Sequence, residues 1–71
     1  MIRHRFSVAI SADEWLATYS GTISNVVVRS TKGIRIAIPI RNFIPYVTYS
    51  GIQGMFEVTC FENRIIELKK L

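Results

Sequence analysis

The sequence predicts an α+β domain that is mostly β. Five strands form one curved antiparallel sheet or a small, partly open barrel, and one short helix lies between strands 1 and 2. Three observations support this prediction: segments in which apolar and polar residues alternate, one segment with the signals of a helix start, and tight turns between the remaining segments. The 71 residues suit one compact domain, residues 1–71.

The first strand is predicted over residues 2–10. Four apolar residues and His4 occupy every second position of this segment, and Arg3 and Arg5 lie between them. Such alternation is typical of a strand with one face toward the core. The face expected to point inward carries Ile2, His4, Phe6, Val8 and Ile10.

The helix is predicted to start at Ser11. Ser11 and Glu14 have the spacing of a capping box, in which each side chain accepts a hydrogen bond from the other residue's backbone N–H. Gly21 offers a stop, because glycine tolerates the left-handed conformation common after a helix. The helix has about two turns and is not stable alone, so we expect Trp15 and Leu16 to hold it against the sheet.

A hairpin is predicted from strands 22–30 and 34–40. The first is rich in β-branched residues, and the second has isoleucine at every second position. The turn between them ends in Gly33, which can adopt a positive φ. Pro39 has no N–H, so we expect it at a sheet edge or with its missing donor directed outward. The inward residues expected in the second strand are Ile34, Ile36, Ile38 and Ile40.

A second hairpin is predicted from strands 55–61 and 64–70, joined by a two-residue turn at 62–63. The preceding residues, 41–51, fit neither period and suggest an ordered connection with one helical turn before Pro45. In the last strand Ile66 and Leu68 are expected to face inward. Two acids on the outward positions, Glu57 and Glu67, are within reach of Arg64 or Lys69.

Cysteine and histidine usage excludes several kinds of site. One cysteine, Cys60, cannot form an intramolecular disulfide, and together with the single His4 it cannot build a four-ligand zinc site. We therefore expect no metal and no cofactor. We also expect no membrane segment and a cytoplasmic location, in which Cys60 stays reduced. Since 49% of this short chain is hydrophobic, self-association is expected, with a dimer favoured.

Catalysis is not supported by the residues available. A nucleophile needs a general base beside it, most often histidine, and His4 is expected on the inward face of the first strand. Cys60 shares the parity of Phe56 and Val58 and is interpreted as a small core residue. No glycine-rich phosphate loop is present. We therefore predict that the protein is not an enzyme.

Positive charge is the first feature that suggests binding. Nine Lys and Arg against five Asp and Glu give a net charge of +4. If the first three strands are neighbours, five arginines fall on one sheet face, which would suit phosphate and hence nucleic acid. The alternative is an ordinary solvated face, which the balance favours. The residues concerned are Arg3, Arg5, Arg29, Lys32, Arg35 and Arg41.

Aromatic residues in the irregular segment are the second such feature. Phe43, Tyr46 and Tyr49 lie beside Arg41 and Asn42. Aromatic and basic side chains together can anchor a protein interface or stack on single-stranded nucleic acid. The plainer alternative is that Phe43 and one tyrosine cover the core while the other tyrosine lies on the surface.

Short segments along the whole chain carry a resemblance to a known family: Phe6 to Ile10, Ile10-Ser-Ala-Asp-Glu-Trp-Leu, Tyr19-Ser-Gly, Val26-Val-Val-Arg-Ser, Lys32-Gly-Ile-Arg-Ile, Phe43-Ile-Pro-Tyr-Val-Thr, Gly51-Ile-Gln-Gly-Met-Phe, Glu62-Asn63 and Leu68. In these segments the chain resembles a bacterial family catalogued as domain of unknown function twenty-eight thirty-five. The resemblance implies a bacterial source, assigns no activity, and carries over no catalytic or binding residue. From the residues themselves we expect a non-enzymatic binding module that associates with itself or another protein, with nucleic-acid binding through a basic sheet face as the alternative.

Overall fold

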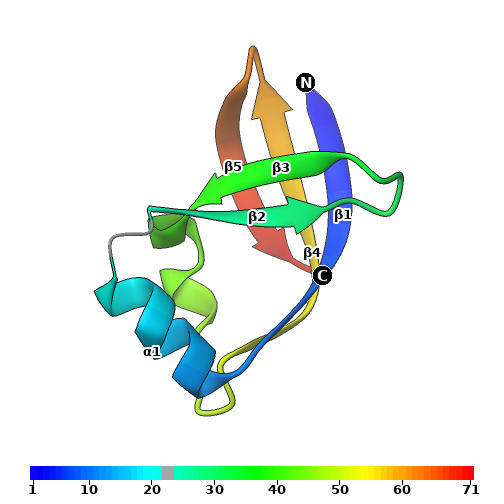
Figure 1. The fold of residues 1–71 in the computed structure, drawn as a ribbon. Coiled ribbons are helices and arrows are strands. Elements are labelled where there is room, and N and C mark those ends of the chain that lie inside the picture. Colours follow the sequence, from blue (N-terminus) through cyan, green and yellow to red (C-terminus); the bar gives the residue numbers. More distant parts are fainter. Residues whose placement is uncertain (22–23) are drawn as a thin grey trace.

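A computed structural model describes residues 1–21 and 24–71. Figure 1 shows a three-stranded sheet crossed by a two-stranded hairpin, with the helices gathered at one end of the molecule. The elements in chain order are β1 (Ile2–Ile10), α1 (Ala12–Ser20), β2 (Asn25–Arg29), β3 (Arg35–Pro39), the 3₁₀ helices η1 (Ile40–Asn42) and η2 (Ile44–Tyr46), β4 (Ile52–Phe61) and β5 (Arg64–Lys70).

The five strands do not form one sheet, so this part of the prediction is wrong. They form a three-stranded antiparallel sheet in the order β1-β4-β5 and a separate antiparallel pair, β2-β3, and over residues 1–21 and 24–71 these strands do not close into a barrel. β1 pairs with β4 along its whole length, from Ile2↔Cys60 to Ile10↔Ile52. A backbone hydrogen bond at the hairpin turn, from Thr31 N–H to the Arg5 carbonyl at 2.8 Å, connects the hairpin to this sheet.

The core lies between the two sheets and is centred on aromatic rings. Phe6 and Phe56 face each other across β1 and β4 and stack with their centroids 5.9 Å apart. Phe43, from the turn between the two 3₁₀ helices, meets the edges of these two rings. Offset stacks and edge contacts of this kind add to the stabilisation that burial provides. The hairpin covers the cluster with Val28 and Ile38, which are buried.

The helix forms where the sequence predicts, and the capping box is present. Gly21 follows the end of the helix as expected, but with φ −87° and ψ −168° it is extended rather than left-handed. Ser11 Oγ accepts from the Glu14 N–H at 3.2 Å, and Glu14 Oε1 accepts from the Ser11 N–H at 3.1 Å. The backbone bond from Ser11, followed by the Ser11 side chain, lowers the pKa of Glu14 below 4.5. Trp15 is buried as expected, whereas Leu16 is 61% exposed and does not hold the helix to the sheet.

The strand predictions differ from the structure mainly at their ends. β2 covers Asn25–Arg29, and the predicted strand residues 22–23 lie outside the described part of the chain. β3 starts at Arg35, so Ile34 lies in the turn and is 46% exposed rather than inward. β4 begins three residues earlier than predicted, at Ile52. Within the described residues no helix is long and apolar enough to cross a membrane.

The second hairpin has the predicted turn, with positive φ at Glu62 and Asn63. The inward position predicted for Ile66 is wrong. The register shifts from Thr59↔Glu67 to Cys60↔Ile65, which leaves Ile66 as the extra residue of a β-bulge. The bulge reverses the parity, so Leu68 is buried, Ile65 packs against the core, and Ile66 is 52% exposed.

Candidate functional site

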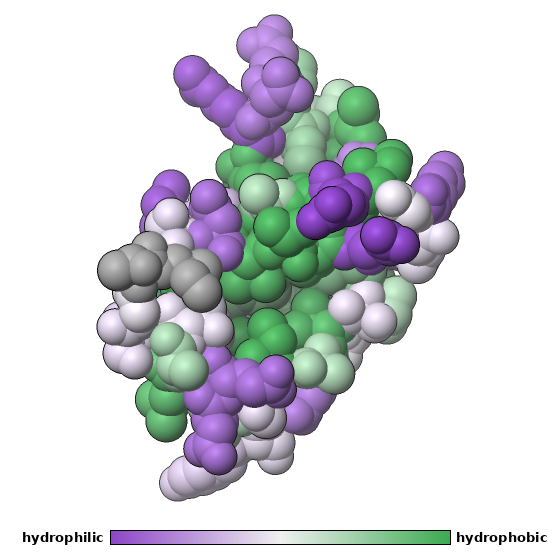
Figure 2. Space-filling model, in the orientation of Figure 1, coloured by the Kyte–Doolittle hydropathy of each residue, from purple (hydrophilic) through white to green (hydrophobic). Residues whose placement is uncertain are grey.

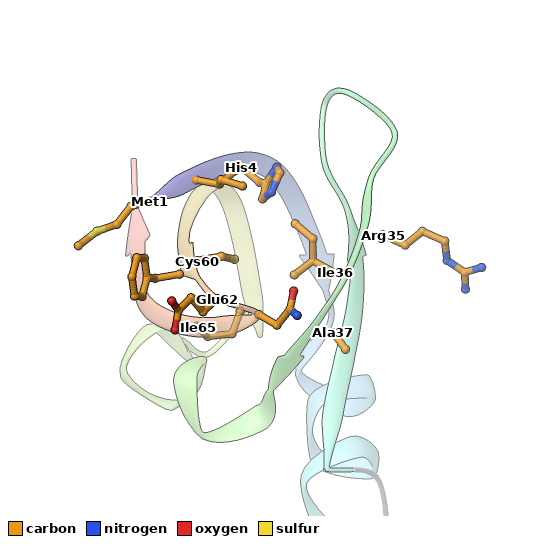
Figure 3. Close-up of a pocket in the computed structure, with 11 residues that line it drawn as sticks. Met1, His4, Arg35, Ile36, Ala37, Cys60, Glu62 and Ile65 are labelled. Atoms are coloured by element: carbon orange, nitrogen blue, oxygen red, sulfur yellow. The ribbon is translucent and has the colours of Figure 1, made fainter.

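A groove runs along β3, between that strand and the β4–β5 hairpin. Its larger part is a cleft of about 450 Å³, and Figure 3 shows Ile36 and Cys60 directed into it while the Arg35 side chain points away. A second hollow of about 370 Å³ follows the same strand and shares Ala37, Asn63 and Ile65 with the cleft. We call the two together the β3 groove. It follows β3 from Arg35 to Pro39.

The edge of β3 that borders this groove has backbone groups available for another strand. Ile40 N–H donates to the Ser24 carbonyl and Ser30 N–H to the Ile34 carbonyl, so the even-numbered residues of β3 bond to β2. In an antiparallel pair the alternate residues then direct their N–H and C=O groups away from the partner. These residues are Arg35, Ala37 and Pro39, and within residues 1–21 and 24–71 no strand pairs with them on that side.

Pro39 therefore stands where the sequence argument puts a strand proline. Its ring replaces an N–H that would point away from β2, so the hairpin loses no internal bond. Arg35 and Ala37 are the two residues of the strand that offer both a donor and an acceptor on the free edge.

Exposed apolar side chains gather at the mouth of the cleft. Met1 is 78% exposed, Ile2 62% and Phe61 47%, and all three line it. Figure 2 shows hydrophobic surface across the middle of the face over β2 and β3, with hydrophilic side chains around it. Sequence reasoning missed these residues, because Ile2 was expected to face the core and Phe61 was counted only as part of a strand. Pro39, predicted at an edge, was the one signal that pointed here.

The three aromatic residues predicted as interface anchors occupy different environments. Phe43 is fully buried in the core, so it is not available to a partner. Tyr46 is half-buried against Phe56, and its hydroxyl donates to the Leu68 carbonyl at 2.7 Å. Tyr49 is fully exposed. This arrangement is the plainer alternative, in which the core takes Phe43 and one tyrosine, and it leaves Tyr49 alone as an accessible anchor.

The predicted basic residues do not lie on one sheet face. That prediction required β1, β2 and β3 to be neighbours, and the strand order separates β1 from the hairpin. Arg3 and Arg5 lie on β1, Arg29 and Arg35 occupy partner positions on β2 and β3, Lys32 lies in the turn and Arg41 in η1. Arg35 and Arg41 line the β3 groove together with Arg64 and the acid Glu62.

Glu57 lies within ion-pair distance of three basic side chains of the three-stranded sheet. Arg5 Nε donates to Glu57 Oε2 at 3.2 Å, and Arg3 Nε and Lys69 Nζ lie 4.0 Å and 3.9 Å from Oε1. The Glu57–Lys69 pair was among those predicted. The Glu57 side chain is 12% exposed, whereas those of its three partners are more than half exposed. The carboxylate thus holds the two arginines on one side of β1.

His4 and Cys60, the two residues considered for catalysis, both line the cleft. Both are partly buried, and Cys60 packs against the core. Among the described residues no group of three His, Cys, Asp or Glu side chains is placed to hold a metal ion. The cleft presents mainly apolar side chains and a strand edge, which are features of a binding surface.

Comparison with known proteins gives one match. The model of a family described as a protein of unknown function (DUF2835) matches residues 2–71, which is essentially the whole chain. No curated protein and no solved structure matches it.

Proposed function

Since the chain belongs to the DUF2835 family, whose description assigns no activity, we propose from its own geometry that it is a non-enzymatic protein-binding module. Its partner is a second copy of the same chain, and the two copies pair along β3. The free edge of that strand, bordered by a groove with exposed apolar side chains at its mouth, is the observation that carries this proposal. Cytoplasmic residence, with a reduced Cys60, is part of the proposal.

The two strands would pair antiparallel about a two-fold axis that passes between the Ala37 residues of the two copies. Such an axis relates identical surfaces and produces a closed dimer. Each Ala37 then exchanges N–H and C=O bonds with the other copy's Ala37, and each Arg35 N–H meets the other copy's Pro39 carbonyl. The pairing is limited to this short stretch, because Pro39 has no N–H to donate in return and β3 ends at this residue.

Surplus apolar surface supports a partner at this place. A chain of 71 residues that is 49% hydrophobic buries a smaller share of its surface than a larger domain can. Part of that surplus lies at the mouth of the groove, where Met1, Ile2 and Phe61 are exposed. A second copy seated on β3 would cover this surface and would also pair the open strand edge, which is otherwise a site of uncontrolled association.

The test is Ala37→Pro, measured by sedimentation velocity over a wide dilution range. The substitution removes an N–H that points away from β2, so it should abolish the dimer and leave the hairpin bonds intact. Val27→Pro is the matched control. Val27 is the partner of Ala37 in the register, is also exposed, and directs its N–H toward the opposite edge of the hairpin.

The expected result is a monomer for Ala37→Pro and a wild-type dimer for Val27→Pro, with both variants folded by circular dichroism. Two results overturn the proposal: a wild-type protein that remains monomeric at its highest soluble concentration, and a dimer that survives Ala37→Pro. A dimer lost only in Val27→Pro would place the interface on β2. A dimer that is lost only when Tyr49 is replaced by a charged residue would place the interface on the turn at Thr48–Gly51.

Nucleic-acid binding through a basic sheet face is the weaker alternative. It depended on five arginines side by side, and the strand order divides them between two sheets and a 3₁₀ helix. Retention of the protein on nucleic acid at low salt, with uniform loss of affinity when arginines of both sheets are neutralised, would favour this alternative over pairing along β3.

A further inference from the structure

A small cavity lies where the β2–β3 turn meets β1, away from the β3 strand edge. It has a volume of about 180 Å³, and three cationic side chains from two distant parts of the sequence line it: Arg3, Arg5 and Lys32. The other lining residues are His4, Ser30, Thr31 and Glu57. We call this space the β1–turn cavity.

The turn that forms one wall of this cavity is held by several hydrogen bonds. Thr31 N–H donates to the Arg5 carbonyl at 2.8 Å, which fixes the turn against β1. Ser30 is buried, and its Oγ accepts from the N–H groups of Lys32 and Ile34 at 3.2 Å and 3.1 Å. Gly33 N–H closes the turn on the Ser30 carbonyl at 2.9 Å. The backbone that carries Lys32 is therefore set in place before any ligand arrives.

The opposite wall is organised by Glu57. Its carboxylate is largely covered and is approached by both arginines through Nε, so their terminal NH₂ groups remain available to a ligand. The cavity has three cations and one carboxylate, and that carboxylate is also shared with Lys69 outside the cavity. Positive charge therefore exceeds negative charge at this place, and the planar donor forks of arginine match the oxygens of an anion.

We propose that the β1–turn cavity binds a phosphate group. The number of donors exceeds what one carboxylate can use: two guanidinium groups, the Lys32 ammonium and the Thr31 hydroxyl are all present. The volume of about 180 Å³ is sufficient for a phosphate group, and the lining offers cationic donors rather than an apolar surface on which a base would stack. The ligand is thus recognised by its phosphate, whether free or at the end of a larger molecule. The cavity shares only His4 with the β3 groove, and its three cations are not among the residues that line that groove, so the proposal does not rest on the dimer.

The test follows backbone amide chemical shifts of the ¹⁵N-labelled protein during titration with inorganic phosphate, with chloride at equal ionic strength as the blank. Saturable shifts are expected at residues 3–5 and 30–32. The central variant is Lys32→Gln, because Lys32 has no ion pair among the described residues and its loss should not disturb the sheet. At low ionic strength its affinity for phosphate should fall about tenfold, the loss expected for one charge-assisted contact.

Lys70→Gln is the matched control. It removes the same charge from β5, at a residue that lines none of the three cavities described here, and should leave phosphate binding unchanged. A single-stranded oligonucleotide without terminal phosphate, titrated in parallel, separates the sources. If it binds with the same Lys32 dependence, the natural phosphate is a nucleic-acid backbone. If only phosphate and phosphomonoesters bind, it is a small molecule.

Three results overturn the proposal. The first is the absence of any saturable change in amide chemical shift with phosphate. The second is a set of chemical-shift changes of equal size near every Lys and Arg of the chain. The third is an equal loss of affinity in Lys32→Gln and Lys70→Gln, which would show general attraction to a protein of net charge +4 rather than a site.

Discussion

Trp15 and Leu16 are adjacent on α1, yet one is 6% and the other 61% exposed. Trp15→Ala should lower the free energy of unfolding by about 3–5 kcal/mol, because it leaves a cavity under the helix. Leu16→Ala should change it by less than about 0.5 kcal/mol, as expected for an exposed position. Urea unfolding measures both. Equal effects of the two substitutions would contradict the packing of α1 described above, and Trp15→Phe serves if the alanine variant does not fold.

The two tyrosines of the irregular segment provide a second residue-scale comparison. Tyr46 donates its hydroxyl to the Leu68 carbonyl at 2.7 Å, whereas Tyr49 is fully exposed. Tyr46→Phe removes that bond without changing the ring and should cost about 0.5–1.5 kcal/mol of stability. Tyr49→Phe should cost nothing measurable. Thermal unfolding of the two variants and the wild type measures both effects. A loss of stability in Tyr49→Phe alone would contradict the placement of Tyr46 against the core and Tyr49 on the surface.

At the scale of the element, the sequence predicted features that depend on regular residue spacing and missed an irregularity in one strand. A capping box depends only on two residues that are three positions apart, so Ser11 and Glu14 predicted the start of α1 correctly. Alternation in β1 likewise identified its buried face, with Phe6 and Val8 inward. The inward position expected for Ile66 was wrong because one extra residue in β5 reverses the parity, and nothing in the local pattern marks that residue.

The helix cap makes stability depend on acid. Hydrogen bonds from Ser11 lower the pKa of Glu14 in the folded protein below its ordinary value of 4.5. The stabilisation is therefore fully present above pH 4.5 and is lost as the pH falls below 4.5 through the lowered value. The difference in unfolding free energy between wild type and Glu14→Gln should accordingly shrink as the solution is acidified through this range.

Ser11→Ala checks the cause of that pH dependence. It should cost about 0.5–2 kcal/mol at neutral pH. It should also remove much of the acid dependence assigned to Glu14, although the carboxyl group itself is still present. An acid dependence that is unchanged in Ser11→Ala would show that the cap does not lower the pKa of Glu14.

At the scale of the whole molecule, the pairing of strands was the main thing that sequence patterns could not supply. Alternation shows which face of a strand is buried, and it does not show which strand is the neighbour. Ile2 and Cys60 are partners although they are far apart in the sequence, and this pairing separates β1 from the β2–β3 hairpin. Both proposed sites depend on this arrangement. The β3 groove needs an unpaired β3, and the β1–turn cavity needs the β2–β3 turn held against β1 by the bond from Thr31 N–H to the Arg5 carbonyl.

Salt should act in opposite directions on the two proposed interactions. Each copy carries a net charge of +4, and the β3 groove is lined by Arg41 and Arg64 against the single acid Glu62. Two copies therefore repel each other while their apolar surfaces attract. Raising the salt from about 0.1 M to about 1 M shortens the screening distance from about 10 Å to about 3 Å, so the dimer should become tighter.

Phosphate binding in the β1–turn cavity relies on attraction to Arg3, Arg5 and Lys32, so it should weaken over the same salt range. Sedimentation equilibrium and phosphate titration in the same sodium chloride series measure both trends. Arg64→Gln provides the control, because it reduces repulsion at the groove and does not line the cavity. It should make the dimer less dependent on salt and leave the phosphate titration as it is. A dimer that dissociates as salt rises would show that ion pairs hold it together, and the apolar pairing along β3 would then be wrong.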